Sequence, residues 1–242
     1  MLKQIIANNK KSGQFCLLFF LCLLFTVLFS CKKKDSYILA PASYDYVPTL
    51  TGHWVIYDVD SISHLDNDGN TDDSIHYFHF QIKEFISSTF IDGEGRPAQR
   101  IERSHRDNDS AAWYITNVWT STVTSNRVER DEENIRYIIL AFPITSDITW
   151  NGNAFNQLGE EDYTYEYFNQ PFTFDSLGLS FDSTLSVLQI DNDNFVERIY
   201  GEEQYAVHVG RISKTYQNLL KYGGQVVSGL DYHETVNSYG NN

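Results

Sequence analysis

The feature that most constrains the fold of this chain is the spacing of its apolar residues, which favours strands over helices. Between His53 and Val59, the side chains of Val55, Tyr57 and Val59 fall on one face of an extended chain. The stretch from Ser74 to Phe90 continues the same two-residue period over a longer run. Because no long stripe with a 3.6-residue period is present, the sequence predicts an all-β protein.

Turn signals divide the remaining chain into further β-rich runs. About ten strands without intervening helices favour antiparallel meanders. We therefore predict a single antiparallel domain over residues 51–242, built as one curved sheet or half-barrel, with a two-sheet sandwich as the alternative. One or two short helical turns are expected, at Glu202–Val209 and Phe155–Leu158. The later runs are Gln99–His105, Trp113–Thr124, Ile135–Phe142, Tyr163–Phe174, Leu179–Ile190, Phe195–Tyr200, Gly210–Tyr216 and Gln225–Tyr239.

The first thirty residues have the order of a secretory signal peptide. Lys3, Lys10 and Lys11 make a basic start, and an apolar run follows from Phe15 to Phe29. That run has about 15 residues, whereas a helix that spans a bilayer needs roughly 20. We therefore interpret residues 1–30 as a signal peptide that is removed on export.

The end of this leader carries a more specific motif. Leu28-Phe29-Ser30-Cys31 resembles the lipobox of bacterial lipoproteins. The resemblance implies transfer of diacylglycerol to the thiol of Cys31, cleavage after Ser30 and acylation of the new amino terminus. The alternative is an uncleaved single-span anchor, but the apolar run is short and three lysines, residues 32–34, end it abruptly.

Lipidation also accounts for the cysteine content. Cys16 and Cys22 leave with the leader, so Cys31 becomes the single thiol of the mature chain and no internal disulfide can form. Several acyl chains on one residue give stable membrane attachment. Residues 31–50, which contain Pro41 and Pro48, are predicted to tether the domain to the bilayer.

The acidic charge of the chain limits the classes of partner that it can bind. The chain has 18 basic and 32 acidic side chains, a formal charge of -14. Loss of the leader removes three of these lysines and no acid, so the mature chain is still more acidic. Nucleic acid is not an expected partner, because phosphate binding needs a dense basic face. Anionic lipid headgroups would repel such a chain, so we expect membrane contact through the lipid on Cys31.

Several segments in order resemble a family of uncharacterised lipoproteins of Bacteroidota, Gram-negative bacteria. They are Gly52–Asp58 (GHWVIYD), Arg100–Arg103 (RIER), Phe142-Pro143 with Thr149–Asn153 (TWNGN), and Tyr205–Gly210 (YAVHVG). The resemblance covers essentially the whole mature chain. It implies a β-rich domain in the cell envelope, on the outer membrane, and fits either its periplasmic or its surface side. It supplies no activity and no catalytic residues.

One loop resembles a calcium site. Asp66, Asp68, Asn70 and Asp72 alternate around Gly69, and Ca²⁺ prefers six to eight oxygen ligands around a tight turn. The twelfth position of an EF-hand loop counted from Asp66 is a tyrosine, where a bidentate acid is needed. The alternative is a solvated hairpin connection made of ordinary turn residues.

Other patterns of catalysis and metal binding are weak. The histidines lack the spacing of a zinc site, and no Gly-x-Ser-x-Gly nucleophile motif occurs. The acidic pairs Glu160/Glu161 and Glu202/Glu203 are predicted to be solvated charge, and the cluster Arg96, Arg100, Arg103 and Arg106 to form surface ion pairs. No metal, no cofactor and no catalytic residue is predicted.

The aromatic residues allow two interpretations. Tyr163, Tyr165 and Tyr167 share one face of a predicted strand, which is either packed in the core or exposed as a platform for a glycan or a protein partner. We predict a lipid-anchored envelope protein that acts as a non-catalytic binding or assembly module. The alternatives are a glycan-active hydrolase and a carrier of hydrophobic ligands.

Overall fold

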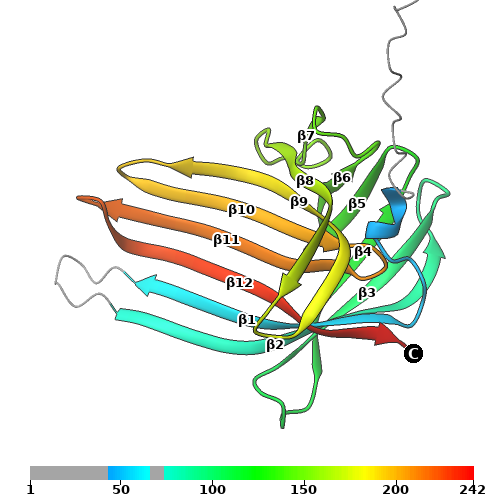
Figure 1. The fold of residues 1–242 in the computed structure, drawn as a ribbon, viewed down its shortest axis with the longest axis horizontal. Coiled ribbons are helices and arrows are strands. Elements are labelled where there is room, and N and C mark those ends of the chain that lie inside the picture. Colours follow the sequence, from blue (N-terminus) through cyan, green and yellow to red (C-terminus); the bar gives the residue numbers. More distant parts are fainter. Residues whose placement is uncertain (1–42, 66–73) are drawn as a thin grey trace, which may run out of the picture. The chain divides into compact units, whose positions relative to one another are not determined.

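The computed structural model describes residues 43–65 and 74–242, which belong to one compact unit, Ala40–Asn242. Its elements are one short 3-10 helix and twelve strands, coloured by sequence in Figure 1. They are η1 (Ser43–Tyr46), β1 (His53–Leu65), β2 (Ser74–Ile91), β3 (Pro97–Arg106), β4 (Tyr114–Val123), β5 (Arg127–Glu132), β6 (Ile135–Ala141), β7 (Thr149–Asn151), β8 (Asp162–Phe174), β9 (Leu179–Asp193), β10 (Glu197–Ala206), β11 (Gly210–Tyr222) and β12 (Gln225–Asn241).

All twelve strands form one antiparallel sheet in the order β6-β5-β4-β3-β2-β1-β12-β11-β10-β9-β8-β7. Strands that are neighbours in sequence pair with each other almost throughout, as expected for meanders. The pairing of β1 with β12 joins the N-terminal half of the sheet to the C-terminal half. The prediction of a single curved antiparallel sheet is confirmed, and the two-sheet sandwich is not formed.

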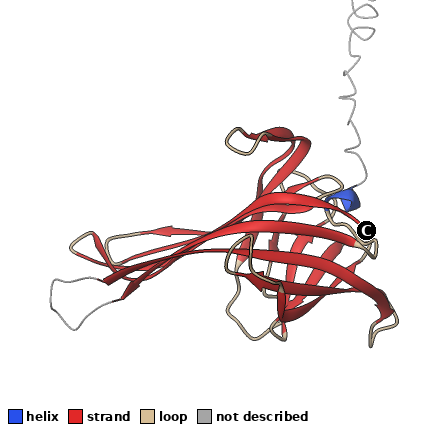
Figure 2. Ribbon diagram, turned by 90° about the horizontal axis from the view of Figure 1, so that it is seen from below, coloured by secondary structure: helices blue, strands red, loops and turns tan. Residues whose placement is uncertain are grey.

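The two edges of this sheet meet. Strands β6 and β7 lie at opposite ends of the strand order, although few residues separate them in sequence. The backbone N–H of Ile138 on β6 donates to the carbonyl of Gly152, just beyond β7, at 2.8 Å. The indole N–H of Trp150 on β7 donates to the carbonyl of Ile138 at 2.9 Å. These bonds convert the sheet into a nearly closed barrel (Figure 2).

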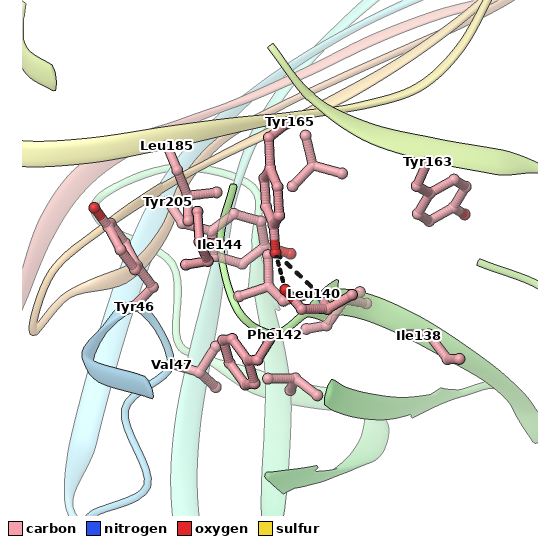
Figure 3. Close-up of a cluster of buried hydrophobic side chains, with 14 of the residues drawn as sticks. Tyr46, Val47, Ile138, Leu140, Phe142, Ile144, Tyr163, Tyr165, Leu185 and Tyr205 are labelled. Carbon is pink, nitrogen blue, oxygen red and sulfur yellow. Dashed lines mark hydrogen bonds between the residues drawn. The ribbon is translucent and has the colours of Figure 1, made fainter. Parts of the chain in front are cut away.

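The buried side chains follow the period of two along the strands. In β1 the predicted face of Val55, Tyr57 and Val59 is buried, whereas the residues between them are partly exposed. A second and larger cluster joins β6, β8, β9 and β10 (Figure 3). In that cluster the hydroxyl of Tyr165 donates to the carbonyl of Ala141 at 2.7 Å and accepts from its N–H at 3.1 Å.

The packed region begins before the boundary predicted at residue 51. Tyr46 and Val47, at and just after η1, are buried in the same cluster as Tyr165 (Figure 3). The carbonyl of Asp45 accepts a hydrogen bond of 2.8 Å from the N–H of His208. The last residues assigned to the tether are therefore part of the domain, because two large apolar side chains there are removed from water.

The predicted helical turns are not formed where they were expected. Residues 202–206 lie in strand β10, and Phe155–Leu158 form turns in a loop. The helical segment of the described residues is instead η1. No helix within these residues is long and apolar enough to cross a membrane. The signal peptide, Cys31 and the Asp66–Asp73 loop lie outside the described residues, so their assignments stay predictions.

Candidate binding cleft

Strand register brings charged side chains together on the interior face of the sheet. Glu203 on β10 lies opposite Lys214 on β11, which lies opposite Glu234 on β12. Residues paired across antiparallel strands point to the same face, so these three form a row of alternating charge. Glu234 in turn lies opposite Val59, one of the buried residues of β1, which places this row inside the barrel.

Arg211 is the centre of the buried ion-pair network. Its Nη2 donates to Glu84 Oε1 at 2.7 Å and to Glu234 Oε2 at 2.6 Å, and its Nη1 donates to Glu203 Oε1 at 3.1 Å. The side chains of Arg211 and Glu234 are each only 1% exposed. One guanidinium therefore holds three carboxylates that come from three different strands.

Two further cations complete the network. Arg103 on β3 donates to Glu234 Oε1 at 2.6 Å and lies 3.2 Å from Glu84 Oε1. The Lys214 ammonium lies 3.3 Å from Glu203 Oε1. The Arg103 guanidinium also stacks over the ring of Trp119 on β4, 4.0 Å from the ring centre. The network thus joins β2, β3, β10, β11 and β12.

The network keeps Glu203 and Glu234 ionised. Burial alone would raise the pKa of Glu203, but Lys214 and Arg211 outweigh it and lower that pKa to about 2. For Glu234, Arg211 and Arg103 overcome the same cost of burial and also lower the pKa to about 2. Tyr232 and Tyr205 donate hydroxyl hydrogen bonds to Glu234 and Glu203, respectively.

A cleft of about 410 Å³ opens beside this network. Its wall combines the exposed side of the ion pairs with aromatic rings from β4, β6, β8, β11 and β12. The charged and amide groups at the wall are Arg103, Glu132, Gln189, Glu203, Lys214 and Glu234, and the aromatic side chains are Trp119, Tyr137, Tyr163, Tyr216 and Tyr232. Its volume lies within the range of small-molecule sites, roughly 300–1,000 Å³.

The predicted aromatic stripe on β8 belongs to the core. Tyr163 and Tyr165 are buried, and Tyr167 is partly buried beyond a β-bulge between Tyr165 and Tyr167. Tyr163 also reaches the wall of the cleft. The core interpretation is therefore confirmed for this stripe, and the aromatic side chains that line the cleft come from several strands instead of one.

Two assignments of charged residues to the surface are wrong. Glu203 was expected to be solvated but is 2% exposed and bound to Arg211. Arg103 was expected in a surface cluster but forms buried ion pairs with Glu84 and Glu234. Both residues point inward because their strand registers place them on the same face as buried apolar neighbours.

The sequence analysis does not predict the buried position of most residues in the network. Glu84 has the same parity in β2 as the apolar Ile82 and Ile86, and Arg211 lies between Gly210 and the fully buried Ile212. A charged residue on the apolar face of a predicted strand is the sequence feature that could have indicated this burial. Among the described residues, no group of three histidine, cysteine or acidic side chains is arranged to hold a metal ion.

The fold and the cleft define a class: a nearly closed antiparallel barrel with a charged, aromatic hollow. No family model matches the chain, and no curated protein matches it. A similar solved structure is described as a "putative lipoprotein from Parabacteroides distasonis". It is 9% identical, covers 81% of this chain and 98% of its own, and superposes with a TM-score of 0.40.

Proposed function

We propose that this chain is a lipid-anchored protein of the bacterial cell envelope that binds a ligand without transforming it. The observation that carries the binding proposal is the cleft of about 410 Å³, in which aromatic rings surround a fixed array of charges. Pockets that combine apolar surface with a few convergent polar groups are typical of ligand-binding proteins.

The lining favours a polar ligand with flat, partly apolar faces, such as an oligosaccharide. Tyr137, Tyr216 and Tyr232 are partly exposed, and tyrosine rings offer both an apolar face and a hydroxyl group. Lys214 and Arg103 keep part of their side chains exposed at the cleft, and their positions are fixed by ion pairs with the buried Glu203 and Glu234. A preorganised wall of this kind lowers the entropic cost of binding.

The two alternatives fit the cleft less well. A glycoside hydrolase needs a carboxylic acid whose pKa is raised so that it can donate a proton. Glu203 and Glu234 have lowered pKa values and are bound to cations. A carrier of hydrophobic ligands would have to cover these charges with apolar surface, which is costly.

The envelope location is proposed from the sequence. Leu28-Phe29-Ser30-Cys31 resembles a lipobox, and the ordered segments from Gly52 onward resemble uncharacterised lipoproteins of Bacteroidota. We propose that lipid on Cys31 holds the domain at the outer membrane. The cleft would then face material that reaches this membrane.

Binding can be tested with the full-length protein in detergent and a panel of soluble oligosaccharides, followed by isothermal titration. We expect at least one oligosaccharide to bind, and the substitutions Tyr216→Ala and Tyr137→Ala each to weaken its binding about tenfold or more, or roughly 1.4 kcal/mol. Tyr222→Ala is the matched control, because Tyr222 is 82% exposed and does not line the cleft.

Three results would contradict the proposal. Release of shortened sugars would indicate the hydrolase. Tight binding of fatty acids by a protein that ignores every oligosaccharide would indicate the carrier. Equal loss of affinity in the Tyr222 and Tyr216 variants would place the binding site outside the cleft.

A further inference from the structure

A second, smaller hollow lies beneath the N-terminal segment and does not depend on the proposed function of the cleft. It has a volume of about 40 Å³. Tyr46, Val47 and Pro48 line it together with buried residues of the barrel interior, among them Arg130 on β5 and Arg211 on β11. Arg211 and Glu84 belong both to its wall and to the ion-pair network.

Three polar side chains at this hollow have hydrogen-bonding atoms without protein partners. They are Nε and Nη1 of Arg130, Nε of Arg211 and Oγ of Ser121, none of which finds a partner in the part of the chain that the structure describes. Ser121 on β4 lies opposite Arg130 on β5, so their side chains share the interior face. All three can donate a hydrogen bond into the same small space.

Among the described residues, Arg130 has two side-chain nitrogens without a hydrogen-bond partner, whereas Arg211 and Ser121 have one such atom each. It is 5% exposed, yet the ion pairs of the network join Arg103, Arg211 and Lys214 to Glu84, Glu203 and Glu234 without it. A buried guanidinium whose N–H groups have no acceptor is costly, because these groups lose their hydration and gain no hydrogen bonds in exchange.

The carboxylate that lines this hollow, Glu84, already binds two other cations through one of its oxygens. Glu84 lines the hollow, but its Oε1 accepts from Arg211 and lies within ion-pair distance of Arg103. Glu132 lines the larger cleft and not this hollow. The hollow is therefore lined by hydrogen-bond donors of Arg130, Arg211 and Ser121 that are unpaired within residues 43–65 and 74–242, and the first two are cationic side chains.

We propose that the hollow binds one small monovalent anion of the size of chloride, held by Arg130, Arg211 and Ser121. A single water-sized particle needs roughly 10–15 Å³ of such volume, so 40 Å³ is enough for one halide ion, which is somewhat larger than water. Charge-assisted hydrogen bonds from two guanidinium groups are of the kind that binds anions most strongly. The anion gives Nε and Nη1 of Arg130 the hydrogen-bond acceptor that they lack in the described part of the chain.

The test is the thermal unfolding of the full-length protein in detergent, in sodium chloride, sodium bromide and sodium gluconate at one ionic strength. At an anion concentration ten times the dissociation constant, binding to the folded state lowers the unfolding constant about 11-fold. We expect chloride and bromide to raise the melting temperature above that in gluconate. Identical melting temperatures in all three salts would overturn the proposal.

Substitutions identify the site. Arg130→Met should fold, because the methionine side chain is of similar length and removes buried N–H groups that have no hydrogen-bond partner among the residues that the structure describes. We expect this variant to lose the halide effect, whereas Arg136→Met, which removes an arginine ion-paired to Asp131 nearer the surface, should retain it. A halide effect that persists in Arg130→Met would contradict the assignment.

A crystallographic measurement keeps the proposal testable even if that variant does not fold. Anomalous scattering from wild-type crystals grown in bromide should give a peak between Arg130, Arg211 and Ser121. Density for water alone in that hollow, or bromide bound only elsewhere, would overturn it.

Discussion

Trp150 and Ile138 lie on strands at opposite edges of one sheet, and the indole N–H of Trp150 donates a hydrogen bond of 2.9 Å to the Ile138 carbonyl oxygen. Ile138 also uses its own N–H to reach the carbonyl of Gly152 at 2.8 Å. Ile138 thus accepts one hydrogen bond and donates the other, and the two bonds join β6 to the region of β7 at the opposite end of the strand order. This closure shapes the interior in which the charged network and the cleft are found.

Trp150→Phe should destabilise the barrel. The substitution leaves the buried Ile138 carbonyl without this donor, and an unsatisfied buried polar group costs about 1–3 kcal/mol. Urea unfolding followed by circular dichroism measures the loss. Trp113→Phe is the control, because Trp113 is only partly buried and lies outside the closure. Equal stabilities of the two variants would show that this bond does not hold the edges together.

Glu234→Gln should be among the most damaging single changes. It removes a carboxylate bound by Arg211 and Arg103, and breaking a buried ion pair on one side typically costs about 3–5 kcal/mol. Asp60→Asn breaks the pair with His79, in which both side chains are well exposed, and should cost less than about 1 kcal/mol. Urea unfolding compares the two. A loss below about 1 kcal/mol for Glu234→Gln would contradict the central role of this network.

The same carboxylates predict a loss of stability in acid. The pKa values of Glu203 and Glu234 are lowered from 4.5 to about 2 in the folded protein. Their contribution is therefore fully present above pH 4.5 and is lost as the pH falls toward about 2, since the unfolded chain binds these protons first. Each carboxylate contributes on the order of 3 kcal/mol over that window.

Free energies of unfolding measured at several pH values between about 6 and 2 test this dependence. The wild type should lose stability steadily below pH 4.5, and Glu234→Gln should show a shallower slope because one of the buried carboxylates with a lowered pKa is absent. Parallel curves for the two proteins would mean that Glu234 does not have a lowered pKa in the folded state.

The long strands were predictable because their apolar residues alternate over many positions, as in β1 and β12. Two short strands were not. β5 has the sequence RVERDE, in which Glu129 is buried by ion pairs with Arg96 and Arg127, and so it lacks an apolar period. β7 has three residues that resemble a turn, and it is fixed by the packing and hydrogen bond of Trp150.

The cleft was less predictable than the fold because its polar residues are paired across long sequence distances. Arg211 binds Glu84, 127 positions away, and Arg103 binds Glu234, 131 positions away. The local sequence around Arg103 or Glu203 is the same as that of a solvated charge. Only the strand register, which a single sequence does not define, turns these residues inward.

The proposal that this is an anchored envelope protein is tested most directly by mass spectrometry of the N terminus of the protein extracted from its native membranes. We predict that the mature chain begins at Cys31 and carries diacylglycerol on the thiol and an acyl chain on the amino group, and that Cys31→Ala leaves an unprocessed, unlabelled precursor. An unmodified Cys31, or a wild-type chain that retains residues 1–30, would contradict the account.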